Sequence, residues 1–385
     1  MTDPMISLDA VRAALHGVKD PEIGKPIDEI GMLGDVRIEG DRVLVNVLLT
    51  VAGCPLKDEI QRRVADAVYS IGGVADVEVR LGLMDPAVRA ELAEGLKGTS
   101  AFSRPDSRTT VIGVSSGKGG VGKSTVTTNL AAAMESLGHN VGVLDADIWG
   151  FSVPRMLGLR GQRPVAFDGM IMPLVAHAPA AVQSTGQATG GTGFVKVISI
   201  GFFLPSEEEP VVWRGPMLHK ALEQFLTDVY WGDDLEYLLI DLPPGTGDIS
   251  LSLATFLPNA GMVVVTTPQP VAQKVAERAA GMADKVKQRL LGVVENMSGF
   301  ECAHCHETTP LFGEGGGELL AQTLEVPLLA KIPLVSEMRQ ASDDGVPFVW
   351  AYPEHPVAQS YRSVAQKLAA FRPRRRLPVM EIGNR

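Results

Sequence analysis

Cysteine is scarce in this sequence. The 385 residues contain three cysteines, at Cys54, Cys302 and Cys305. Three thiols in a chain of this length cannot form the disulfide framework of a small secreted protein. The close pair, Cys302 and Cys305, must therefore serve metal or redox chemistry.

Long hydrophobic runs and an excess of positive charge are also missing. No uninterrupted apolar stretch approaches the roughly 18 residues of a membrane span. The formal net charge of −10 argues against general nucleic-acid binding, which leaves a basic footprint. Residues 1–5 have neither a basic start nor an apolar core, so we expect no secretory signal and a cytoplasmic protein with neither membrane nor nucleic-acid partners.

The chain is organised around a glycine-rich loop at residues 117–125. Residues 117–124 follow the pattern G-x-x-x-x-G-K-[ST], whose backbone N–H groups surround phosphate while Lys123 reaches the outer phosphates and Ser124 binds magnesium. A buried strand is predicted before the loop and a helix after it, as the motif requires. The predicted ligand-binding residues are Gly117, Lys118, Gly119, Gly120, Val121, Gly122, Lys123, Ser124 and Thr125.

Lys118 directly follows the first glycine of the loop. A lysine there resembles the deviant Walker A ATPases, a family of chromosome-partitioning, septum-positioning, arsenite-pump, nitrogenase-reductase and iron-sulfur-carrier ATPases. The resemblance implies ATP as the ligand. It also implies that Lys118 reaches the nucleotide of a partner subunit, and hence a homodimer closed around two ATP molecules.

Carboxylates end two of the predicted strands. Asp145 and Asp147 close the strand at 140–147, and Asp241 closes the strand at 237–241; ligands bind at such carboxyl ends of parallel strands. The family resemblance implies that Asp147 positions the attacking water or a magnesium-bound water and that Asp145 supports the metal shell. We predict Asp241 as a water-mediated magnesium ligand, although acids that merely cap strand ends would also fit. The predicted catalytic residues are Lys118, Lys123, Asp147 and Asp241.

Alternating strands and helices continue to about residue 370. Further strands are predicted at 262–269 and 292–298, and a helix through Tyr230. We therefore expect an α/β fold, a P-loop NTPase domain at 109–370 with a mostly parallel, doubly wound sheet covered on both faces. Family resemblance places Asn296 against the adenine. Iron-sulfur carriers usually have proline where Phe151 stands.

The first 90 residues predict a small α/β domain, followed by a linker at 91–108. Its order is helix, hairpin, helix and strand, and with the Asp20-Pro21-Glu22 segment it resembles the small domain of iron-sulfur assembly proteins. Cys54 precedes the second helix, whose dipole would favour a thiolate. A reactive or metal-binding thiol and a small buried hydrophobe both remain open for Cys54.

Four chemistries compete for the pair Cys302 and Cys305. The run Cys302-Ala303-His304-Cys305-His306 matches a haem-attachment pattern, but we expect no export signal. A thioredoxin-like pair would open a helix in its own βαβ unit. Zinc shared by two subunits is open, as is an iron-sulfur cluster, for which a symmetric dimer supplies four thiolates.

The two cysteines after the segment 296–300 closely resemble those of Mrp/ApbC-type iron-sulfur cluster carriers, and the likeness spans the whole chain. It implies a 4Fe-4S cluster bridging a homodimer, slow ATP hydrolysis, and iron-sulfur scaffold and recipient apoproteins as partners. This chain departs from those carriers at Ala303 and His306, where proline and glycine are more usual.

Two rival functions share parts of this pattern. A septum-positioning or partitioning ATPase would end in a basic amphipathic helix, but Pro373 and Pro378 interrupt the basic tail at 371–385. A cluster-containing, electron-donating reductase resembling the nitrogenase iron protein would carry its two cysteine ligands far apart. The close spacing of Cys302 and Cys305 favours the carrier.

Overall fold

The computed structural model describes two compact units. The first contains Met1–Ser100, Pro164–Pro173 and Thr227–Gly232, and the remaining chain forms the second. Residues 180–193, all but the first residue of the predicted tail at 371–385, and half of the predicted linker at 91–108 lie outside the described residues, which are 6–51, 54, 56–96, 102, 107–147, 150–179, 194–204, 215–245, 248–269, 288–302, 304–305 and 307–371.

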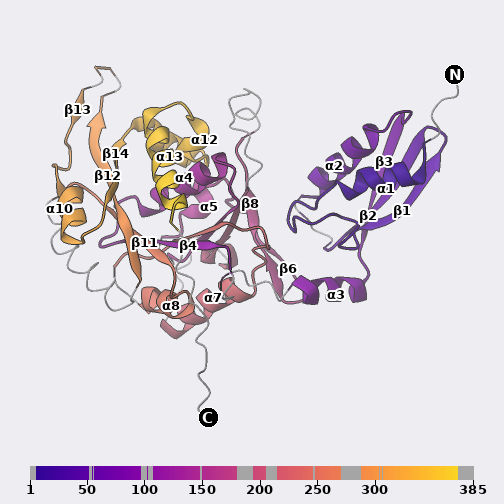
Figure 1. Ribbon diagram of the computed structural model, residues 1–385, viewed down its shortest axis with the longest axis horizontal. Coiled ribbons are helices and arrows are strands. Elements are labelled where there is room, and N and C mark those ends of the chain that lie inside the picture. The colour runs from indigo at the N-terminus through magenta and orange to yellow at the C-terminus, as the bar shows by residue number, and fades with distance from the viewer. Residues whose placement is uncertain are drawn as a thin grey trace, which may run out of the picture. The chain divides into compact units, whose positions relative to one another are not determined.

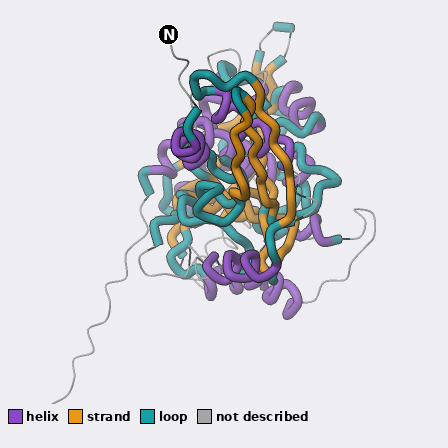
Figure 2. Tube along the Cα trace, turned by 90° about the vertical axis from the view of Figure 1, so that its right-hand side faces the viewer, coloured by secondary structure: helices purple, strands orange, loops and turns teal. Residues whose placement is uncertain are grey.

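A three-stranded sheet with three helices forms the body of the first unit, a small α/β fold as predicted, although the third helix was not expected. Its elements are α1 (Leu8–His16), β1 (Leu33–Glu39), β2 (Arg42–Leu49), α2 (Lys57–Tyr69), β3 (Asp76–Leu83) and α3 (Pro86–Leu96). β2 pairs antiparallel with β1 and parallel with β3, and Figure 2 shows the three strands side by side. α3 runs across residue 90, where the sequence predicts the end of this domain.

Segments from much later in the chain complete the first unit. β6 (Val165–Phe167) and β7 (Met170–Met172) form an antiparallel hairpin, and the Tyr230 hydroxyl donates to the carbonyl oxygen of Ile23 at 3.1 Å. The predicted helix through Tyr230 is wrong at its end, because α7 (Gly215–Thr227) stops earlier. Tyr230 instead packs into the apolar core of the first unit.

Cys54 lies in that core and is 4% exposed. Burial raises the pKa of its thiol to about 11, and the carboxylates of Glu22 and Asp20 push the pKa in the same direction. Of the two alternatives left open, the thiolate at a helix N-terminus does not agree with this raised pKa, because desolvation and nearby negative charge outweigh the helix dipole. Cys54 is the small buried hydrophobe of the two alternatives.

The second unit is built on one large, mostly parallel sheet. Its order is β13-β12-β11-β4-β10-β5-β9-β8, with β14 also paired to β12, and only β8 and β13 run antiparallel to their neighbours. The strands are β4 (Thr110–Ser116), β5 (Val141–Asp145), β8 (Leu174–Ala176), β9 (Val195–Ser199), β10 (Tyr237–Asp241), β11 (Gly261–Thr266), β12 (Arg289–Glu301), β13 (Thr308–Thr309) and β14 (Leu328–Leu334).

Helices cover both faces of this sheet, confirming the predicted doubly wound fold. In Figure 1, α4 (Lys123–Ser136), α12 (Phe348–Ala351) and α13 (Pro356–Ala369) lie above the strands, and α7 and α8 (Asp248–Phe256) lie below them. The other helical elements are α5 (Val153–Met156), the 3₁₀ turn η1 (Ile200–Phe203), α10 (Gly316–Thr323) and α11 (Ser336–Asp343). Among the described residues, no helix is long and apolar enough to cross a membrane.

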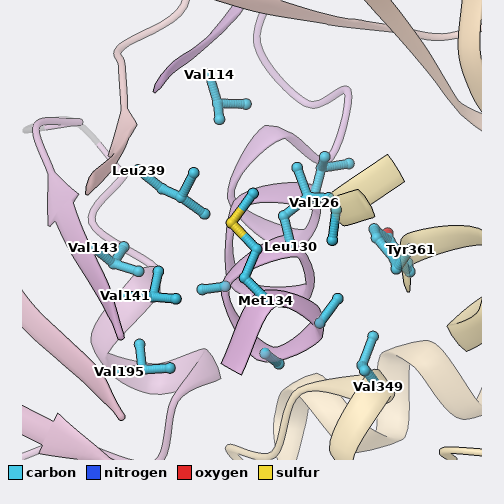
Figure 3. Close-up of a cluster of buried hydrophobic side chains, with 14 of the residues drawn as sticks. Val114, Val126, Leu130, Met134, Val141, Val143, Val195, Leu239, Val349 and Tyr361 are labelled. Carbon is cyan, nitrogen blue, oxygen red and sulfur yellow. The ribbon is translucent and has the colours of Figure 1, made fainter. Parts of the chain in front are cut away.

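Most of the helix that follows the glycine-rich loop is embedded in the core. Leu130 and Met134 of α4 are fully buried, and Figure 3 shows them between Leu239 of β10 and Tyr361 of α13. Each such side chain contributes about 1.5–3 kcal/mol when buried. This packing holds the N-terminus of α4, and with it the loop, in one place.

Candidate functional site: a phosphate loop and a thiol hairpin

The glycine-rich loop joins β4 to α4 in a conformation that needs glycine. Gly120 and Gly122 have φ angles of 76° and 79°, a left-handed region that other residues rarely adopt. The Ser116 hydroxyl donates to the carbonyl oxygen of Lys118 at 3.0 Å and steadies the turn. The free N–H groups at the start of α4 then make the loop an anion site.

A cavity of about 260 Å³ lies over this loop. Most of its wall is the loop from Gly119 to Thr125, whereas Gly117 and Lys118 of the predicted set are not among the lining residues. Its lining residues are Ser116, Gly119, Gly120, Val121, Gly122, Lys123, Ser124, Thr125, Asp147, Gly150, Ser152, Met156 and Pro244.

Asp241 is the most heavily bonded carboxylate at the site. Strand pairing sets it beside Asp145 of β5, and it is fully buried. One carboxylate oxygen accepts a hydrogen bond from Ser124 at 2.5 Å and lies 2.9 Å from Lys123 Nζ. The other oxygen accepts from Thr127 at 2.7 Å.

A hydroxyl and a carboxylate in contact form the hard oxygen donor set that Mg²⁺ prefers. The Ser124 hydroxyl and the Asp241 carboxylate therefore fit a magnesium ion, which would neutralise phosphate charge when bound. Lys123 is buried between Asp241 and Asp147, with its Nζ 3.4 Å from the Asp147 carboxylate. Its ammonium group offers a positive charge at the cavity wall.

Asp145 has no exposed surface. It accepts hydrogen bonds from the Ser199 hydroxyl at 3.0 Å and from the backbone N–H of Asp147 at 3.2 Å. Burial, and secondarily the Asp241 carboxylate, hold the pKa of Asp145 well above its usual range. Asp145 thus shapes the turn that carries Asp147 to the cavity.

The other two predicted nucleotide contacts are engaged within the chain. The Lys118 ammonium donates to the side-chain carbonyl of Gln269, while its action across a dimer stays a prediction. The Asn296 amide donates to the carbonyl oxygen of Val121 at 2.9 Å. Asn296 therefore braces the loop, and its contact with adenine stays a prediction.

Cys302 and Cys305 lie in the loop of a β-hairpin, between β12 and β13. β12 extends to Glu301, and Phe300 and Glu301 pair antiparallel with β13. The Cys302 N–H donates to the carbonyl oxygen of Glu307 at 3.0 Å. Cys302 is partly exposed and Cys305 is exposed, so both residues of this thiol hairpin reach the surface of the second unit.

Phe151 packs against the η1 turn. A Cβ atom placed on Gly201 would lie 2.4 Å from the Phe151 ring. The aromatic ring therefore packs directly on the backbone of η1.

Three residues of the site escaped the sequence analysis. Thr127 binds Asp241, Ser199 binds Asp145, and Gln269 binds Lys118. Thr127 follows Lys123 by four residues and so lies on the same helix face, a detectable signal. Ser199 ends the apolar run of β9, as Asp145 ends that of β5, so this run could have predicted a polar side chain at a strand end.

The fold and this constellation define a P-loop nucleoside triphosphatase. A family described as NUBPL iron-transfer P-loop NTPase matches residues 107–369. One described as iron-sulfur cluster assembly protein matches residues 8–81. The chain therefore belongs to the iron-transfer P-loop NTPases, is an ATPase by that membership, and carries a fused N-terminal iron-sulfur assembly domain, as the sequence resemblance implied.

Named relatives agree along almost the whole chain. An iron-sulfur cluster carrier protein of Mycobacterium tuberculosis (strain ATCC 25618 / H37Rv) is 48% identical, covering 97% of this chain and 96% of the relative. One of Deinococcus radiodurans is 42% identical, covering 94% of each. The structure of an ADP-bound nucleotide-binding protein from Archaeoglobus fulgidus covers 68% of this chain and 96% of its own at 37% identity, with a TM-score of 0.52.

Proposed function

We propose that this protein is a cytoplasmic, ATP-dependent carrier that holds a 4Fe-4S cluster between two copies of itself and delivers it to recipient apoproteins. The observation that carries the proposal is the thiol hairpin. Cys302 is partly exposed and Cys305 exposed beyond the end of β12, and Asn296, earlier in the same strand, contacts the glycine-rich loop. The names of the relatives support cluster carriage as the function.

Ligand number supports the dimer. A 4Fe-4S cluster takes four thiolates, and one chain offers Cys302 and Cys305 as a pair, since Cys54 is buried in the first unit. Two hairpins related by a two-fold axis supply two thiolates each. Exposure of the thiols also suits cargo that must leave for another protein.

The nucleotide site supplies the ATP dependence. The glycine-rich loop and Lys123 bind the phosphates, while Ser124 and Asp241 hold Mg²⁺. Asp147, at the cavity wall, orients the attacking water, and Lys118 stabilises charge on the nucleotide of the partner subunit. The complete site forms only in the dimer, and hydrolysis by it is slow.

Anaerobic reconstitution with iron and sulfide tests the proposal. We expect about four irons and four sulfides per dimer, and transfer of the cluster to a model apoprotein. Cys302→Ala or Cys305→Ala leaves two thiolates per dimer, so iron retention should collapse while ATP binding survives. Cys54→Ala is the matched control and should keep the cluster. Stoichiometric zinc without sulfide, or cluster loss in the control, would contradict the assignment.

A further inference from the structure

Strand β12 contacts the glycine-rich loop before it reaches the thiol hairpin. The Asn296 amide holds the Val121 carbonyl. A Cβ atom on Gly122 would lie 2.2 Å from Asn296 Nδ2 and 3.6 Å from Met297 Cε. Two consecutive side chains of β12 therefore press against the last glycine of the loop, and that glycine cannot move without displacing them.

The neighbouring residue anchors the same point of the strand to another element. Glu295 is 1% exposed, and its carboxylate accepts hydrogen bonds from the Ser298 hydroxyl and from the N–H of Gly317 in α10, each at 2.5 Å. A buried carboxylate with both oxygens bonded is a rigid attachment. The strand is thus held between α10 and the glycine-rich loop.

Immediately beyond this anchor the strand is bent. Met297 has a φ of 56° and Gly299 a φ of 94°, and the pairing of β12 with β14 shifts register between Asn296 and Phe300. A non-glycine residue in the left-handed region is unusual, and such strain gathers at switching segments. After the bend, the strand pairs with β13 and ends at Cys302.

We propose that the Met297–Gly299 bend is a hinge and that Asn296 is a positioning residue linking nucleotide at the loop to the placement of Cys302 and Cys305. Phosphate binding draws the loop N–H groups inward and shifts Val121 and Gly122, on which Asn296 bears. Because Glu295 fixes the strand to α10, the displacement of Asn296 changes the backbone at the Met297–Gly299 bend. This inference rests on the proposed function and specifies how its two sites communicate.

Alkylation of the cluster-free, reduced, full-length protein tests the link. The labelling rates of Cys302 and Cys305 with iodoacetamide are followed by peptide mass spectrometry, with and without a saturating, non-hydrolysable Mg-ATP analogue. We expect the analogue to change these rates about 5-fold or more, the usual range for coupled sites. Cys54, which is buried, serves as the internal reference.

For each cysteine we compare the labelling rate with the analogue to the labelling rate without it. In Asn296→Ala this ratio should become about one, while the labelling rate without nucleotide stays within about 2-fold of wild type. Saturation is checked by direct nucleotide binding, so weakened affinity cannot imitate lost coupling. Met297→Gly, which frees the bend without touching the Asn296 amide, should also lower the ratio. It provides a second variant if the first does not fold.

Asn129→Ala is the matched control. Asn129 is a buried amide of α4 that bonds the Thr125 carbonyl and the Val349 N–H, so it supports the loop's helix without touching β12. Its ratio should remain that of wild type. Two results would overturn the hinge. One is a labelling rate in wild type that the nucleotide analogue does not change, and the other is a wild-type ratio of labelling rates with and without the analogue in Asn296→Ala. Failure of cluster reconstitution would instead refute the proposed function, since labelling needs no cluster.

Discussion

The nucleotide site and the thiol hairpin stand at opposite extremes of burial. Lys123 and Asp241 are 5% and 0% exposed and bonded on several sides, whereas Cys305 and the adjacent β13 are exposed. Preorganised charges in a dry site stabilise developing charge. An exposed hairpin instead lets a bound cluster enter and leave. ATP hydrolysis and the proposed cluster carriage therefore require different surroundings within one unit.

The largest expected effect separates these two regions. Lys123→Ala should lower ATP hydrolysis about 1000-fold, because the outer phosphates lose their buried charge partner. Reconstituted iron per dimer should stay at the wild-type value, since the hairpin is untouched. Phosphate release and iron content measured on one preparation check this, and unchanged turnover would reject the site assignment.

Stability should show the same contrast. Leu130→Ala leaves a cavity under the glycine-rich loop and should destabilise the second unit by about 3 kcal/mol. Leu311, which follows β13 and is 54% exposed, is the matched leucine, and Leu311→Ala should change stability by less than about 0.5 kcal/mol. Denaturant unfolding measures both; equal losses would contradict the difference in packing.

Lys118→Ala tests whether the nucleotide site, unlike the thiol hairpin, needs a lysine from the partner subunit for hydrolysis. Nucleotide binding to one chain should remain measurable while hydrolysis falls about 10-fold or more, because the transition state loses a donor supplied in trans. Mixing this variant with Lys123→Ala places both lesions in one composite site and leaves the other intact. No recovery of activity in proven heterodimers would count against the trans role.

The smallest expected effect concerns the buried thiol. Cys54 has a folded pKa near 11, raised above its unfolded value, so its contribution to stability is complete below about pH 9 and declines as the pH rises through 11. We expect the first unit to lose about 1 kcal/mol between pH 8 and 10. Cys54→Ala should remove that slope, and pH-dependent unfolding curves will show whether it does.

Much of the nucleotide site could be predicted because its residues are contiguous or end strands. The spacing from Gly117 to Ser124 specifies a loop, and the apolar runs before Asp145 and Asp241 specify buried parallel strands. Ser199 was missed because its importance comes from the pairing of β9 with β5. Nothing in its local sequence marks a partner 54 residues away.

Cys54 shows the limit most clearly. Its position before a helix predicts a lowered pKa, yet the packing of the first unit buries it beside Asp20 and Glu22. Helix position is a local property, whereas desolvation depends on every segment that covers the thiol. Here those surroundings reversed the sign of the pKa shift.

The sequence by itself determined the phosphate loop, the two strand-end acids, the cysteine pair and the order of strands and helices, because each depends on short-range spacing. Tertiary structure alone decided that residues 164–173 and 227–232 complete the first unit. It also placed the thiols on a hairpin. It placed Asn296 against the glycine-rich loop, which lies more than 170 residues earlier in the sequence. Such contacts depend on the packing of segments that are distant in the sequence, and a local sequence pattern does not contain the free energy of that packing.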